Sequence, residues 1–154
     1  PRAAWADPPA AGANPFGFRG YVPSATLSGE DLEIRTYESV RIEAGGGAWL
    51  TCRACLDTGN GGVTMVTSDI ARQIGAVDGF GNAPLGSRSV QVRGVVAGAS
   101  ERVPIVPIVY SLKGKTMRID AGVTPMGSFG DGVKLLISLR DIKTFQAAGY
   151  TFSA

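Results

Sequence analysis

The chain has 154 residues and a formal net charge of +2, and 44% of its residues are hydrophobic. This length favours a single domain with a hydrophobic core. The small net charge, with no block of lysine and arginine, argues against a nucleic-acid partner, and no apolar run is long enough to span a membrane. Because the chain contains no histidine, Ser-His-Asp catalysis, Cys-His catalysis and His-ligated metal sites are excluded.

Two regions differ in composition. Residues 1–28 are rich in Pro, Ala and Gly with scattered aromatic residues, which predicts a flexible tail or linker. An arm that packs against a partner is the alternative. Residues 29–154 contain short runs of Val, Ile and Thr between glycines, which predicts a folded domain of strands joined by tight turns. The first residue, Pro1, indicates a processed chain, a piece of a precursor or an expressed fragment.

Apolar and polar residues alternate over residues 32–43 and again over residues 48–57, on either side of three glycines. This pattern predicts a hairpin whose second strand runs directly into Asp57. Cys52 and Cys55 lie in that strand, three positions apart and therefore on opposite faces. We interpret them as core or half-buried thiols, in preference to a zinc or redox pair.

The rest of the domain alternates short strands with short helices. Pro104 and Pro107 indicate an edge or bulged strand. One helix is predicted over residues 69–74, and a second follows Ser138, which forms a capping box with Asp141. Short strands are predicted at residues 64–66, 90–96, 103–110, 117–119, 133–137 and 150–152.

The most informative segment is residues 54–60, ACLDTGN, in which apolar residues lead into Asp57, Thr58 and Gly59. Alone, Asp-Thr-Gly is a common turn tripeptide. In its context, the segment resembles the active-site motif of the retropepsin family of aspartic proteases, including relatives of the DNA-damage-inducible type. In that family an apolar strand also passes beside the motif and enters a helix, and residues 135–141, LLISLRD, resemble this second signature. The order of elements agrees over residues 32–152.

The resemblance implies a mainly β fold, a single-lobe closed barrel with one or two short helices. It also implies a homodimeric aspartic endopeptidase, because the chain carries one Asp-Thr-Gly motif and the chemistry needs two. The Asp57 carboxyls of two copies would share a proton, one activating water and the other protonating the peptide carbonyl. Thr58 would brace the two loops, and Gly59 would allow a tight turn. No metal, cofactor or covalent intermediate is implied.

The family also has a flap that covers a peptide or protein substrate. The loop at residues 78–86 is the candidate, with Gly79, Phe80 and Gly81 at its tip. Substrate would lie extended between this flap and the floor of the site. The predicted strand at residues 150–152 is where dimers of the family interlock.

Three positions depart from the family pattern. Asn60 stands where Ala or Ser is usual, and Ser138 replaces a Gly, which we interpret as a helix N-cap. Gly61 occupies the position of an acidic residue in retroviral members, so Arg140 lacks that partner. These departures suit a second hypothesis, a catalytically inactive subunit of the same fold whose N-terminal tail contacts other subunits of a larger assembly. A third is a small β-barrel binding domain with a coincidental Asp-Thr-Gly.

Overall fold

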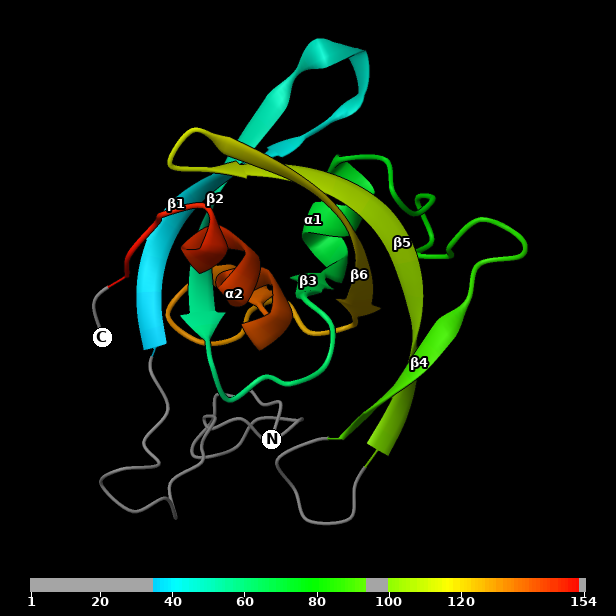
Figure 1. Cartoon of the computed structure of the whole chain (residues 1–154). Helices are drawn as coiled ribbons and strands as arrows, with labels where there is room; N and C mark the ends of the chain where they lie inside the picture. The colour runs from blue at the N-terminus through cyan, green and yellow to red at the C-terminus, as the bar shows by residue number, and fades with distance from the viewer. Residues whose placement is uncertain (1–34, 94–99, 153–154) are drawn as a thin grey trace.

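The structure, a computed structural model, describes residues 35–93 and 100–152. Seven strands form one sheet in the order β1-β2-β7-β3-β6-β5-β4, and pairing of β1 with β5 closes the first six into a barrel (Figure 1). This confirms the predicted mainly β barrel with short helices. In chain order the elements are β1 (Arg35–Glu43), the 3-10 turn η2 (Gly45–Gly47), β2 (Trp49–Asp57), β3 (Met65–Thr67), α1 (Ser68–Gln73), β4 (Ser89–Arg93), β5 (Ser100–Leu112), β6 (Lys115–Thr124), β7 (Val133–Ile137) and α2 (Leu139–Ala147).

The predicted first hairpin is confirmed. Strands β1 and β2 pair without interruption from Glu43 opposite Trp49 to Arg35 opposite Asp57. The turn between them uses two glycines of η2, Gly46 and Gly47, whose φ angles of 73° and 81° favour residues without a Cβ. The hairpin therefore delivers Asp57 at the end of a long, fully paired strand.

Strand β7 lies in the middle of the sheet, between β2 and β3. It runs parallel to β2, with Leu56 opposite Ile137, and antiparallel to β3, with Met65 opposite Leu136. Four of its five residues are buried, and they include residues of both faces, which matches the compact apolar sequence of β7. Its C-terminal end is level with the end of β2.

The structure corrects the predicted strands in the second half. Strand β6 covers Lys115–Thr124 and not only residues 117–119, and it follows β5 through a two-residue turn at Lys113 and Gly114, both with positive φ. Strand β5 is not an edge strand, because it lies between β6 and β4, and its two prolines are paired, Pro104 with Ser89 and Pro107 with Asp120. Residues 150–152 form no strand.

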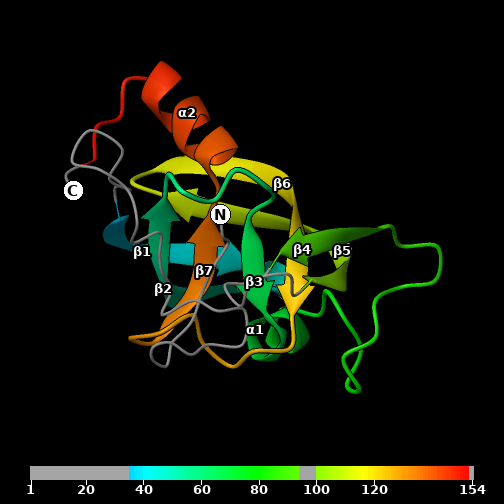
Figure 2. The ribbon, with the colours of Figure 1, turned by 90° about the horizontal axis from the view of Figure 1, so that it is seen from below.

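Two groups of buried apolar side chains hold the fold together. The larger group fills the barrel and includes Val40, Leu56, Leu135 and Phe145. The smaller group joins the β4–β5 hairpin to strands β2, β3 and β7, and consists of Cys55, Met65, Val92, Val103, Phe129, Val133 and Leu136. Helices α1 and α2 lie on opposite sides of the strands (Figure 2).

Some predictions fall on residues outside those described. They are the tail at residues 1–28, the beginning of the first strand at residues 32–34, and residues 94–96 of the strand predicted over residues 90–96. Among the described helices, none is long and apolar enough to cross a membrane.

Candidate active site

Asp57 is the last residue of β2, and its side chain has no exposed surface. Its Oδ1 atom accepts a hydrogen bond from the Gly59 N–H at 2.9 Å, and its carbonyl oxygen accepts one from the Asn60 N–H at 3.0 Å. Thr58 and Gly59 are half-buried. The predicted motif thus forms a tight turn that fixes the Asp57 carboxylate against the backbone that follows it.

Asn60 has a structural role in this turn, so its departure from the family pattern has a physical explanation. The side chain is buried, and its Oδ1 accepts the Gly62 N–H at 3.0 Å while its Nδ2 donates to the Val63 carbonyl at 3.1 Å. Both polar ends of the amide are therefore used inside the loop. Neither Ala nor Ser could make both contacts at that reach.

The C-terminal end of β7 and the start of α2 lie directly beside the Asp57 turn, as the second signature predicted. The Leu139 N–H donates to the Asn60 carbonyl at 2.8 Å. Ser138 is the N-cap of α2, with its side chain accepting from the Asp141 N–H, which confirms the interpretation of Ser138. Gly149, with φ of 97°, follows the end of the helix.

A buried polar cluster, which the sequence did not predict, lies under this junction. The Thr64 hydroxyl is 2.6 Å from Asp141 Oδ2 and accepts the Ser138 N–H at 3.0 Å. The Tyr110 hydroxyl donates to the same Asp141 oxygen at 3.4 Å. Burial, and then the negative charge of Asp141, raise the pKa of the Tyr110 phenol far above its ordinary value. We call Thr64, Tyr110, Ser138 and Asp141 the Thr64 cluster.

The two cysteines are free thiols in β2, Cys52 half-buried and Cys55 buried. This confirms the interpretation of both as core or half-buried residues. Burial raises the pKa of the Cys52 thiol to about 11, which keeps it protonated and unreactive at neutral pH. Among the described residues, no three His, Cys, Asp or Glu side chains form a group that could hold a metal ion.

The structure does not bring Gly79, Phe80 and Gly81 to the Asp57 turn. They lie in an exposed loop between α1 and β4, and both views place this loop on the opposite side of the molecule from the end of β2 (Figures 1 and 2). Phe80 is 91% exposed. In Figure 1, β4 runs toward the side on which β2 ends.

Two further family features differ here. Tyr150 and Phe152 lie in no strand, and their rings pack edge-on against Phe145 of the same chain, at centroid distances of 5.8 and 6.1 Å. Gly61 and Arg140 are both exposed, so the terminal-helix arginine projects from the surface.

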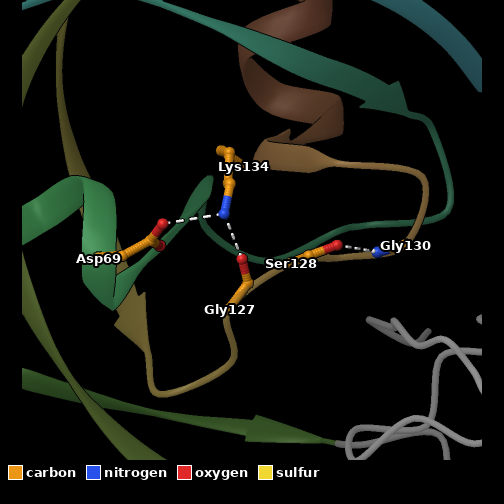
Figure 3. Close-up of polar contacts among 5 residues, drawn as sticks. All are labelled: Asp69, Gly127, Ser128, Gly130 and Lys134. Carbon is orange, nitrogen blue, oxygen red and sulfur yellow. Dashed lines mark hydrogen bonds and ion pairs between the residues drawn. The ribbon is translucent and has the colours of Figure 1, made fainter.

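A half-buried ion pair anchors the loop between β6 and β7 (Figure 3). Lys134 Nζ donates to Asp69 Oδ2 of α1 at 2.8 Å and to the Gly127 carbonyl at 2.6 Å. Burial acts to raise the pKa of the Asp69 carboxyl, but hydrogen bonding, first of all by Lys134, together with the charge of Lys134 outweighs it, so this pKa is lower than usual. The pair fixes a loop that carries Phe129 of the smaller apolar group.

Lys134→Met is expected to destabilise the protein by about 1 kcal/mol at pH 7, since both partners keep some exposure to water. The lowered pKa of Asp69 stabilises the folded state above about pH 4, and this contribution disappears as pH falls through that pKa. The difference between variant and wild type should therefore shrink on acidification. Urea unfolding at pH 7 and pH 3 measures it, with Arg88→Met, which removes an exposed pair with Asp120, as the control expected to change little. An equal difference at both pH values would contradict this assignment.

No protein-family model matches the chain, and no curated protein matches it either. A function is therefore inferred from the geometry of the Asp57 turn and its neighbours.

Proposed function

We propose that the chain is an aspartic endopeptidase of the retropepsin type that acts as a homodimer. The observation that carries this proposal is the position of Asp57: it ends a barrel strand, accepts the Gly59 N–H, and lies level with the end of the parallel strand β7. Two such carboxylates facing each other can share one proton and split the roles of base and acid toward water and a peptide carbonyl. One chain provides only one of them, so activity requires two copies.

The surroundings of Asp57 support a substrate with apolar side chains. Asp57 and Cys55 lie two positions apart in β2 and therefore on the same face, and Cys55 belongs to the smaller apolar group. Val63, Val90 and Met126 extend this group and are only partly buried. An extended peptide beside this face would bury its own apolar side chains against them.

The second candidate is a catalytically inactive subunit of the same fold in a larger protein assembly. It is favoured by the complete burial of Asp57 in the single chain, because a catalytic carboxylate must meet water and substrate. It is also favoured by Tyr150 and Phe152, which pack on Phe145 of their own chain.

Cleavage of a mixed peptide library between acidic and neutral pH separates the two candidates. The endopeptidase should cut within peptides, with apolar residues flanking the cut, and a statine-type compound should inhibit it. A folded protein that cuts no peptide in the library would favour the inactive subunit.

A further inference from the structure

We propose that Thr64 and Asp141 are positioning residues that hold the Asp57 turn in place from beneath, a role that rests on the proposed function of Asp57. The loop from Asp57 to Thr64 leaves β2 and returns into β3. Its first half is held by the Leu139 N–H, which donates to the Asn60 carbonyl. Its far end is held by the Thr64 hydroxyl, so both ends of the loop are tied to the start of α2.

Thr64 takes over a contact that normally belongs to the helix itself. In a capping box, the side chain three residues into the helix accepts the N–H of the N-cap residue. Here the Ser138 N–H donates to Thr64 Oγ1 at 3.0 Å. The Asp141 carboxylate is thereby available to accept the Thr64 hydroxyl at 2.6 Å. The helix cap is completed by the loop, which couples the position of the loop to the position of α2.

The Asp141 carboxylate is also held by a residue of a barrel strand. Tyr110, in β5, has no exposed surface and donates to Asp141 Oδ2 at 3.4 Å. Its ring packs against Phe145 of α2 at a centroid distance of 6.1 Å. Thr64, Ser138 and Asp141 are 2%, 1% and 7% exposed, so water cannot replace a lost partner within the cluster. Removal of the Thr64 hydroxyl would leave the Ser138 N–H and the Asp141 carboxylate short of a partner.

Loss of the Thr64–Asp141 hydrogen bond should affect the chemical step more than substrate binding. Catalytic groups must be held within a fraction of an ångström of the productive geometry, whereas the hydrogen bonds of the Thr64 side chain go to Ser138 and Asp141 and to no side chain of the smaller apolar group, which is proposed to face substrate. We therefore expect a loss in kcat with little change in KM.

The test compares Thr64→Val, which keeps the shape but not the hydroxyl, with Thr64→Ser, which keeps the hydroxyl. Amide hydrogen exchange of the Gly59 N–H, which donates to Asp57, reports on the turn whether or not the protein cleaves peptides. In Thr64→Val this exchange should rise about tenfold or more relative to the amides of Leu56 and Ile137, and kcat should fall. Thr64→Ser should restore both. Asp141→Asn, which keeps the shape and removes the charge, should change both in the same direction and provides a second variant if Thr64→Val does not fold.

Ile108→Val, a trimmed core residue in β5, controls for general destabilisation, because it should speed the exchange of core and turn amides equally. The proposal is overturned if Gly59 exchange in Thr64→Val rises only in step with Leu56 and Ile137. A selective rise at Gly59 in a protein that cuts no peptide would support the positioning role and reject the proposed catalysis, so the two claims fail separately.

Discussion

Asp57→Asn is expected to lower peptide cleavage by at least about 100-fold, the smallest effect usual for loss of a general acid or base. Asparagine keeps the shape of the side chain, and its Oδ1 can still accept the Gly59 N–H that Asp57 accepts at 2.9 Å. The turn should therefore remain folded while the ability to exchange a proton with water and substrate is lost. Initial rates of cleavage of a fluorogenic peptide measure the effect.

Asp120→Asn is the matched control. It makes the same chemical change at an exposed carboxylate, which forms an ion pair with Arg88 at 3.4 Å on the surface. Cleavage by this variant should stay at the wild-type rate. If wild type and Asp57→Asn are both well folded by circular dichroism and cleave at equal rates, Asp57 has no catalytic role.

Phe145→Ala is expected to destabilise the fold by about 3–5 kcal/mol, a large part of the stability of a domain of this size. The Phe145 ring has no exposed surface, and it contacts the rings of Tyr110, Tyr150 and Phe152. Its removal leaves a cavity between α2, the barrel and the end of the described chain. Urea unfolding followed by circular dichroism measures the loss.

Phe80→Ala makes the same substitution at a ring that is 91% exposed. Its stability should stay within about 0.5 kcal/mol of wild type. The same variant also tests the predicted flap loop, because a residue that covers substrate would raise KM when truncated. A loss of stability at Phe80 equal to that at Phe145 would contradict the packing described here.

The parts of the fold predicted most accurately were those in which one physical signal dominated. The alternation that ends at Asp57 gave the β1–β2 hairpin, since a strand with one buried face repeats every two residues. The strand at residues 133–137 and the Ser138 cap were both confirmed, because a short apolar run followed by a capping box has few other structural meanings.

Other features depended on contacts between distant parts of the chain. Strand β6 was predicted too short because polar residues lie on both sides of residues 117–119, whereas the last four residues of the strand are buried in the structure. In the Thr64 cluster, Thr64 contacts Ser138, which is 74 positions further along the chain, and Asp141, which is 77 positions further. No local sequence pattern marks Thr64. Asp141 gave a partial signal through its spacing from Ser138, but that spacing predicted a cap and not a contact with the Asp57 loop.

The glycines at residues 79 and 81 were a misleading signal for the flap. They satisfy a local turn, in which Asp78 Oδ1 accepts the N–H groups of Phe80 and Asn82. The described strands of the β4–β5 hairpin contain no glycine.

The central claim is that one active site contains Asp57 from two copies of the chain, and a mixing experiment tests it most directly. Wild-type protein at fixed concentration is equilibrated with increasing amounts of Asp57→Asn, and cleavage is measured at each ratio. If chains exchange freely between dimers, a tenfold excess of the variant should reduce wild-type activity to about one tenth, because most wild-type chains then lie in hybrid dimers. Activity that stays constant at every ratio would show that a single chain is sufficient, and would contradict the proposed site.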